Sequence, residues 1–172
     1  MKHKFFGLIF LVTLLVLSTS SLNSEASKEK DAIQEMEIKG IAFDQNLQTP
    51  VVLLTDKEES VILPIWIGLC EARSIELGLS EKVAPRPLTY DLIAAIVRTM
   101  NAKVERILIV DLSDQVFYAQ VEVSVDGKVS KIDARPSDAI ALASRMNSPI
   151  YVKQTVLDKA ALLDKDKEKR EL

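Results

Sequence analysis

Two carboxylates and one guanidinium lie close together in this sequence, at the point where an extended apolar segment meets a helix rich in small residues. Asp133, Arg135 and Asp138 fall within six consecutive positions there. A similar arrangement occurs earlier, where Arg86 precedes a proline and Asp91 follows a few residues later. In both places the proline fits the first position of a helix, and the free backbone N–H groups at that end of a helix attract anions. The residue types and their spacing therefore predict a charged site for a phosphate group or a metal ion.

The elements that must position these side chains can be predicted from the apolar pattern. Seven extended segments are expected from alternating or β-branched runs separated by polar turns, at residues 36–43, 51–54, 61–67, 104–112, 116–125, 128–132 and 150–152. Asp126-Gly127 is a two-residue hairpin signal, and the almost wholly apolar run at 61–67 predicts a strand covered on both faces. Helical spacing predicts three principal helices, 68–79, 87–100 and 136–146, and a short last helix at 156–163. We therefore expect an α+β fold in which a mixed, mostly antiparallel sheet is flanked by three principal helices.

The N-terminus has the parts of a secretory signal peptide. Lysines at positions 2 and 4 precede a 13-residue apolar run at 5–17, and Ser24-Glu25-Ala26 offers small residues for cleavage. The run is shorter than the roughly 20 residues that span a bilayer, although an uncleaved anchor or a wrongly assigned start codon would also explain it. The expected organisation is a signal peptide at 1–26, a linker at 27–35, a single domain at 36–163 and a charged tail at 164–172. The protein would then be exported, periplasmic or extracellular, without stable membrane insertion after cleavage.

Composition and charge exclude several classes of protein. The 172 residues are 48% apolar with few aromatics, so a core of Val, Ile, Leu and Ala is expected. Cleavage after Ala26 removes two lysines and one glutamate from 22 basic and 25 acidic residues, which leaves a net charge of −4 and argues against a protein that packages duplex DNA. The only histidine, His3, lies in the signal, and Cys70 is the single cysteine. Cys–His pairs, Ser–His–Asp triads, histidine zinc sites and internal disulfides are therefore excluded from the mature chain.

Three segments together resemble the bifunctional nuclease domain family, also described as the DNase/RNase domain. They read LPIWIG at 63–68 followed by Glu71-Ala72, RPLTYDL at 86–92, and DARPSDAIALA at 133–143. PIYV at 149–152 and VLD at 156–158 fit the same pattern. The resemblance covers about residues 36–163 and implies a compact α/β domain that hydrolyses DNA and RNA. One departure concerns Tyr90, because the family usually shows histidine after R-P-L-T.

Hydrolysis of a phosphodiester bond needs a nucleophilic water, relief of the charge on the phosphate, and help for the leaving oxygen. A divalent metal ion such as Mg or Mn, held by carboxylates, supplies all three without histidine. Arginine guanidiniums can hold a phosphate through two parallel hydrogen bonds. The candidate residues are Asp133, Asp138 and Glu71 for the metal and catalysis, Asp91 to orient water, and Arg135, Arg86 and Tyr90 for the phosphate, with Tyr90 also able to stack on a base.

Each candidate also has a structural explanation. An acid in the first turn of a helix is stabilised by the helix dipole by about 0.3–1 kcal/mol. Asp133 could pair with either arginine, and a tyrosine is commonly buried with its hydroxyl at a rim. Lys103, Arg98 and Arg106 would extend a basic path for a nucleic-acid strand, or would simply lie on a solvated face.

Two functions follow from these alternatives. The first is an exported nuclease that hydrolyses DNA and RNA with metal assistance. The second is a non-enzymatic binding or assembly module of the same fold, in which the Arg-Pro helix starts are structural latches. Hydrolysis of another phosphoester, such as a nucleotide, is a third alternative, and a homo-oligomer is compatible with each.

Overall fold

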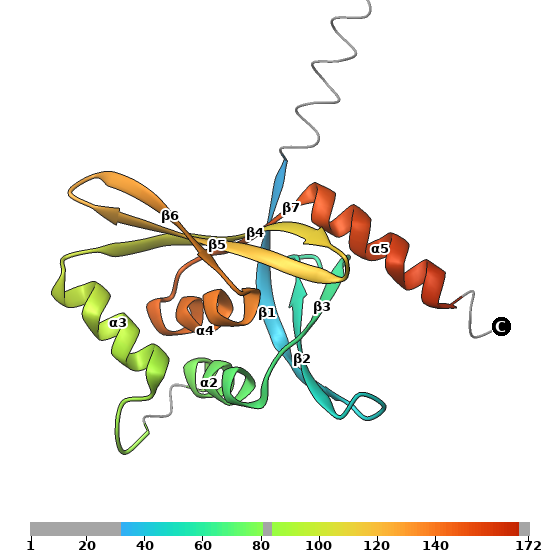
Figure 1. Ribbon diagram of the computed structural model, residues 1–172, viewed down its shortest axis with the longest axis horizontal. Helices are drawn as coiled ribbons and strands as arrows, with labels where there is room; N and C mark the ends of the chain where they lie inside the picture. The colour runs from blue at the N-terminus through green and yellow to red at the C-terminus, as the bar shows by residue number, and fades with distance from the viewer. Residues whose placement is uncertain (1–31, 81–83, 169–172) are drawn as a thin grey trace, which may run out of the picture. The chain divides into compact units, whose positions relative to one another are not determined.

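Seven strands form one sheet in the computed structural model, which describes residues 32–80 and 84–168 (Figure 1). The strands are β1 (Ile33–Asp44), β2 (Thr49–Thr55), β3 (Ile62–Trp66), β4 (Lys103–Ser113), β5 (Val116–Val125), β6 (Lys128–Ala134) and β7 (Ile150–Lys153). Their order across the sheet is β3-β2-β1-β7-β4-β5-β6. Only β4 and β7 run parallel; the other neighbours are antiparallel. The predicted mixed, mostly antiparallel sheet is therefore confirmed.

Two antiparallel meanders, β1-β2-β3 and β4-β5-β6, lie on either side of β7. Local turn chemistry closes them. In the turn between β5 and β6, Asp126 and Gly127 have φ values of 49° and 77°, as a type I′ hairpin turn requires. Between β1 and β2, Asp44 Oδ1 accepts hydrogen bonds from the backbone N–H groups of Asn46 and Leu47. Both turns form at positions that the sequence marks as turns.

Four helices are found among the described residues: α2 (Leu69–Leu79), α3 (Thr89–Thr99), α4 (Pro136–Met146) and α5 (Gln154–Glu168). Helix α4 packs on β4 and β5 and against α2 and α3, whereas α5 packs along β4 and β7. The three principal helices are confirmed, and the fourth is longer than the predicted short helix at 156–163. Helix α3 begins two residues later than the predicted residue 87, because Leu88 is its N-cap and has an extended backbone with ψ of 176°.

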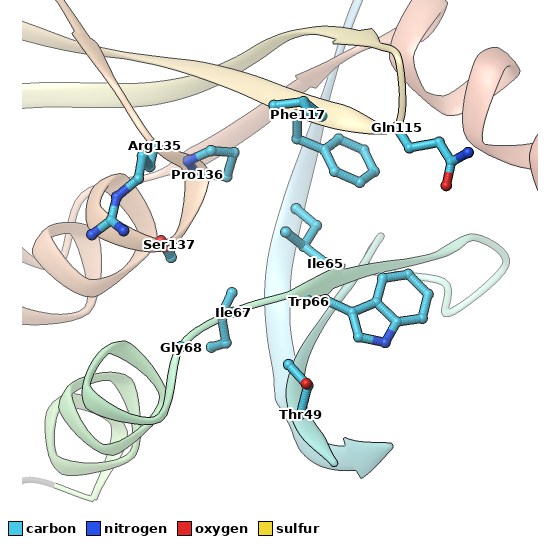
Figure 2. Close-up of a pocket in the computed structure, with 11 residues that line it drawn as sticks. Thr49, Ile65, Trp66, Ile67, Gly68, Gln115, Phe117, Arg135, Pro136 and Ser137 are labelled. Atoms are coloured by element: carbon cyan, nitrogen blue, oxygen red, sulfur yellow. The ribbon is translucent and has the colours of Figure 1, made fainter. Parts of the chain in front are cut away.

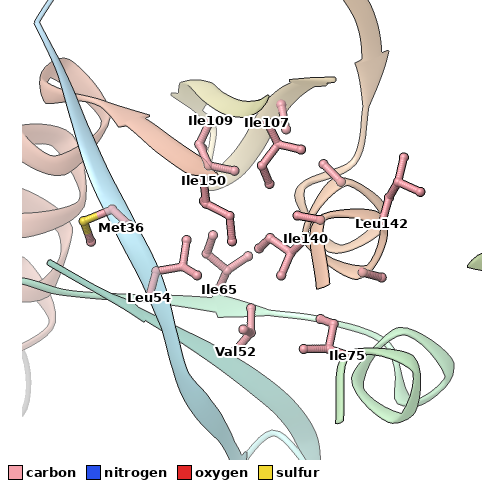
Figure 3. Packing of buried hydrophobic residues seen from close by; sticks show 14 of the residues in the cluster. Met36, Val52, Leu54, Ile65, Ile75, Ile107, Ile109, Ile140, Leu142 and Ile150 are labelled. Atoms are coloured by element: carbon pink, nitrogen blue, oxygen red, sulfur yellow. The ribbon is translucent and has the colours of Figure 1, made fainter. Parts of the chain in front are cut away.

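Branched and small aliphatic side chains build the core between the sheet and α2 and α4. Val52, Leu54, Ile75, Ile107 and Ile140 have no exposed surface, and Figure 3 shows them pointing toward one another from β2, α2, β4 and α4. Within the described chain, Tyr90 is the single aromatic residue among the buried members of this cluster. The predicted aliphatic core is confirmed, and each large-to-small change in it would cost about 2–5 kcal/mol of stability.

The strand β3 differs from its prediction, because it lies at an edge of the sheet and is not covered on both faces. Leu63 and Ile65 are buried, whereas Ile62 and Trp66 are 51% and 38% exposed. The apolar run therefore alternates between a core face and an open face. The strands β3 and β6 are the two free edges at which self-association would be expected, and the homo-oligomer stays a prediction.

The ends of the domain also differ from their predicted places. Residues 33–35, in the predicted linker, pair with β7, and α5 continues to Glu168, into the predicted tail. The predicted signal peptide at 1–26 and the first residues of the linker lie outside the described residues. None of the described helices combines the length and apolar character needed to cross a bilayer.

Candidate functional site

The junction between β6 and α4 fixes the position of Arg135. Strand β6 ends at Ala134, and Pro136 is the first residue of α4. Proline restricts the preceding residue to extended backbone, and Arg135 has φ −66° and ψ 144°. Proline also lacks the N–H that the first helical position leaves unbonded. The predicted position of Pro136 as the first residue of the helix is confirmed, and Arg135 is the N-cap of α4.

Four side chains from three helices meet at this junction, and we call them the acid–arginine cluster: Glu71 of α2, Tyr90 of α3, Asp138 of α4 and the N-cap Arg135. Arg135 Nε donates to Asp138 Oδ2 at 2.6 Å, and Nη2 donates to Asp138 Oδ1 at 2.8 Å. The same Nη2 donates to Glu71 Oε1 at 2.9 Å. Tyr90 Oη donates to Asp138 Oδ1 at 2.6 Å. The cluster thus joins positions that are 64 and 48 residues apart in the sequence.

Electrostatics fix the protonation of three members of the cluster. The hydrogen bonds from Arg135, and to a smaller extent from Tyr90, lower the pKa of the Asp138 carboxyl, which is therefore ionised at neutral pH. Burial, and then the hydrogen bond to Asp138, raise the pKa of the Tyr90 hydroxyl, so Tyr90 stays neutral and donates. The hydrogen bonds to Asp138 and Glu71 raise the pKa of Arg135, which stays charged. Arg135 is thus the cation of the cluster and lies between two carboxylates.

Glu71 is held against the backbone of Gly68. Its side chain is 16% exposed, and a Cβ at position 68 would lie 2.2 Å from Glu71 Oε2. Glycine at this position therefore leaves the space that the carboxylate occupies. Glu71 Oε1 binds Arg135, whereas Oε2 makes no hydrogen bond with any described residue. The structure thus holds one carboxylate oxygen open beside the guanidinium.

A pocket of about 370 Å³ lies beside the cluster, and we call it the α4 pocket. Its wall is formed by β3 with the following Ile67 and Gly68, by the turn between β4 and β5, and by the first residues of α4. Figure 2 shows Arg135 and Ser137 at one end, Gln115 at the other, and the rings of Trp66 and Phe117 on opposite sides. The volume is at the lower end of the range found for small-molecule sites.

Asp133 does not join the cluster, because strand alternation turns it to the other face of the sheet. Asp133 pairs with Gln120, whereas the next residue, Ala134, pairs with the buried Ala119. Successive strand residues point to opposite faces, and α4 covers the face of Ala119 and Ala134. Asp133 is exposed and makes no hydrogen bond with a described residue.

The expected three-carboxylate metal site is not formed. Among the described residues, no three acidic, histidine or cysteine side chains lie together in a way that could hold a metal ion. Asp133 is on the opposite face, and Arg135 binds both Glu71 and Asp138, so a guanidinium takes the place that the prediction gave to the metal. Glu71, Asp133 and Asp138 therefore do not fit a shared Mg or Mn ion in this arrangement.

Asp91 is occupied by structural contacts. The backbone N–H of Leu88 donates to its Oδ2 at 2.9 Å and caps α3, and Arg145 Nε donates to its Oδ1 at 2.5 Å. The Leu88 bond is the main cause of the lowered pKa of Asp91, and the Arg145 contacts add to it. Neither carboxylate oxygen is directed to the cluster, so the predicted role of Asp91 in orienting water has no geometric support.

The other predicted basic residues do not form a phosphate site or a continuous path. Arg86 is exposed and has no hydrogen bond or ion pair with a described residue. Arg106 is bound by Glu122 through Nε at 2.8 Å and Nη2 at 3.1 Å, and Lys103 pairs with Glu105. Arg98 donates to the backbone carbonyl of Arg145 at 3.1 Å. Three of these four cations are therefore used within the fold.

Sequence reasoning missed Arg145, which links α2, α3 and α4. Its side chain is 11% exposed; besides binding Asp91, its Nη1 donates to the Ser74 carbonyl at 2.6 Å. A basic residue in the last turn of a helix is common because it complements the dipole, so the sequence carried no signal for this link. The α4 pocket was missed as well, because it depends on β3 being an edge strand.

Fold and site together define a class of protein: a single α+β domain in which an acid–arginine cluster caps a helix beside an aromatic-walled pocket. The chain belongs to the bifunctional nuclease domain family, whose model matches residues 52–165. It is also similar to the uncharacterized proteins MT1877 and Rv1829 from two strains of Mycobacterium tuberculosis, CDC 1551 and H37Rv. Each is 39% identical over 137 residues, which cover 80% of this chain and 82% of the relative. The resemblance noted in the sequence is therefore confirmed at the level of the family.

Proposed function

We propose that this protein is a nuclease that hydrolyses phosphodiester bonds of DNA and RNA, and that the phosphate binds where α4 begins. One observation carries the proposal: Arg135 is held beside Glu71 and beside backbone donors that have no helical partner. The first helical hydrogen bond of α4 runs from Ala139 N to Arg135 O at 3.0 Å, so the N–H groups of Ser137 and Asp138 precede it. A guanidinium and two free N–H groups at the positive end of a helix favour an anion.

Each member of the cluster has a distinct role in this proposal. Arg135 Nη1, which has no bond to a described residue, holds the phosphate together with the N–H groups of α4. Glu71 Oε2 accepts the proton of the attacking water or hydroxyl. A new P–O bond then forms as the bond to the leaving oxygen breaks, the leaving oxygen takes a proton from solvent, and Arg135 offsets the charge that develops on the phosphate oxygens. Asp138 positions Arg135, and Tyr90 positions Asp138.

The proposal is tested by a nuclease assay on the purified chain, with fluorescently labelled single strands of DNA and RNA as substrates. Glu71→Gln and Arg135→Ala are expected to lower the rate by about a hundredfold or more, the usual effect of losing a general base or an oxyanion contact. Asp133→Asn is the matched control, because it removes a carboxylate two residues from Arg135 on the other face. Full activity in Glu71→Gln, or a comparable loss in Asp133→Asn, would contradict the proposal.

Metal assistance by Mg or Mn stays a prediction, and the same assay tests it. The rate is measured after dialysis against EDTA and again after each ion is added back. Loss of activity in EDTA that is restored by one ion would support metal assistance, with ligands other than the predicted set of three. Activity unchanged by EDTA would contradict it.

A second candidate function is a non-enzymatic binding or assembly module, and the pairing inside the cluster favours it. Arg135 binds Asp138 of its own helix and Glu71 of α2, while Tyr90 of α3 binds Asp138. The hydrogen bonds of such a cluster would hold the helices α2, α3 and α4 together and stabilise the fold. In this case no substrate is cleaved by the wild-type chain, while Glu71→Gln still lowers the melting temperature.

Export is also proposed, on the basis of the signal-like N-terminus alone. Mass spectrometry of the protein from the native cell tests it. A mature chain that begins at residue 27 outside the cytoplasm is the expected result, and a full-length cytoplasmic chain would contradict it.

A further inference from the structure

The α4 pocket has the chemistry of a site for a flat aromatic ligand. Trp66 from β3 and Phe117 from β5 lie on opposite sides of it with the Ile65 side chain between them, and Ile67 adds apolar surface (Figure 2). Its polar side chains are few: Arg135 and Ser137 lie at one end, Gln115 at the other, and Thr49 on the side below Trp66 in the view. Apolar and aromatic walls with a few polar groups suit a ring that carries hydrogen-bonding atoms on its edge.

Two residues of the pocket wall bear on how a ligand would be held. The indole Nε1 of Trp66 donates to Asp44 Oδ2 at 3.0 Å, which fixes a ring that is 38% exposed at the edge of the sheet. Ser137 is 9% exposed and lines the pocket, and its hydroxyl makes no hydrogen bond with a described residue. Among the described residues no buried side-chain polar atom lacks a partner, so this hydroxyl is reached by solvent, and a ligand that displaces the water can bond it.

We propose that the α4 pocket binds one unpaired nucleobase of the strand whose phosphate lies at Arg135, so that the protein acts on single-stranded and not on duplex nucleic acid. This inference rests on the proposed function, because it takes Arg135 as the phosphate contact. Bases stack on aromatic side chains with little dependence on sequence, which agrees with activity on both DNA and RNA. A base in a duplex is already stacked and paired and would have to be extruded at an energetic cost.

The single tryptophan of the chain makes this pocket directly observable. Trp66 is the only source of indole fluorescence, so a base that enters the pocket quenches the signal of the full-length chain. The probe is an eight-nucleotide deoxythymidine strand with phosphorothioate linkages, which resist cleavage. It is compared with an abasic strand of the same length and with the matched duplex. Quenching by the deoxythymidine strand, with binding of the other two weaker by at least about fivefold, is the expected result.

Variants of the two aromatic walls test the same contact by anisotropy of a labelled strand. Phe117→Leu and Trp66→Leu keep apolar volume and remove a stacking surface, and each is expected to weaken binding roughly 5- to 140-fold. Tyr118→Leu removes a 45% exposed aromatic residue next to Phe117 that does not line the pocket, and should bind like wild type. Circular dichroism confirms that each variant is folded before it is compared.

The outcomes separate the base pocket from the phosphate site. Equal binding of the abasic and deoxythymidine strands, or wild-type binding in both leucine variants, would overturn the base pocket even if Arg135 variants lost cleavage. Weaker binding in the leucine variants with unchanged binding in Arg135→Ala would support the base pocket and overturn the phosphate contact. Equal binding of duplex and single strand would overturn the predicted preference for single strands.

Discussion

Replacing Gly68 by alanine should separate Glu71 from Arg135 without straining the backbone. A Cβ at this position would lie 2.2 Å from Glu71 Oε2 and 3.2 Å from its Cδ. The φ of Gly68 is −75°, which alanine adopts readily, so the Glu71 side chain must move instead. Glu71 Oε1 then loses its 2.9 Å contact with Arg135, which joins α2 to the start of α4.

The expected change in the free energy of unfolding is about 1 kcal/mol. A hydrogen bond to a charged group contributes about 1.5–3 kcal/mol, but the Arg135 side chain is 67% exposed, and solvent screening reduces the value to about 1 kcal/mol. Alanine is a poorer N-cap residue than glycine, which lowers the free energy of unfolding by about 0.5–1 kcal/mol. Alanine also restricts the unfolded chain more than glycine does, which raises the free energy of unfolding by about 0.4–1 kcal/mol, so these two effects nearly cancel. The loss of about 1 kcal/mol lowers the melting temperature by roughly 3 °C for a domain of this size.

A double-mutant cycle followed by thermal circular dichroism checks this reasoning. In the Glu71→Ala background the new Cβ meets no carboxylate, so Gly68→Ala should change the stability by less than about 0.5 kcal/mol. In the wild-type background it should lower the stability by about 1 kcal/mol and the cleavage rate by about a hundredfold. Equal losses in the two backgrounds, or a Gly68→Ala chain as stable and active as wild type, would refute the proposed contact.

Three further outcomes are expected. The pKa of Asp138 is lowered in the folded state, mainly by Arg135. Its contribution to stability is therefore full above the unfolded pKa near 4 and is lost as the pH falls through the folded pKa. The free energy of unfolding in urea should therefore differ less between pH 7 and pH 3 in Asp138→Asn than in wild type. Tyr90→Phe removes one hydrogen bond to Asp138 and should lower the free energy of unfolding by about 1 kcal/mol in a thermal melt. Tyr90→His introduces the residue usual in the family and should keep the cleavage rate within about tenfold of wild type. A larger loss of cleavage rate in Tyr90→His than in Tyr90→Phe would contradict this. Arg145→Ala leaves the partly buried Asp91 without its cation and should destabilise the domain by about 2–3 kcal/mol in urea, whereas a change below about 0.5 kcal/mol would show that the link is unimportant.

Local chemistry explains what could be predicted from the sequence. The Asp126-Gly127 turn, the proline at the start of α4 and the aliphatic core each follow from the preferences of a few neighbouring residues. The sequence pattern also predicts on which face of the strand Asp133 lies. Lys131 and Asp133 alternate with Ile132 and Ala134, so alternation alone places this acid on the face opposite the apolar residues.

The remaining features depend on contacts that no local pattern encodes. Glu71 reaches Arg135 because α2 packs against α4, although 64 residues separate them. The exposure of Trp66 depends on β3 lying at the edge of the sheet, which is fixed by the order of all seven strands. A run that is apolar on both sides predicts a strand covered on both faces, and the edge strand β3, which lines the α4 pocket, is a case in which that rule fails.

The four-residue strand β7 determines when the two halves of the sheet can assemble. Within the described sheet, this strand alone is hydrogen-bonded to both three-stranded halves, to β1 on one side and to β4 on the other. A chain that stops after Met146 would still contain every member of the acid–arginine cluster, but its two halves would share no ladder. Assembly of the whole sheet must therefore wait until residue 153 has been synthesised, and pairing of residues as distant as 33 and 153 makes slow folding the natural expectation.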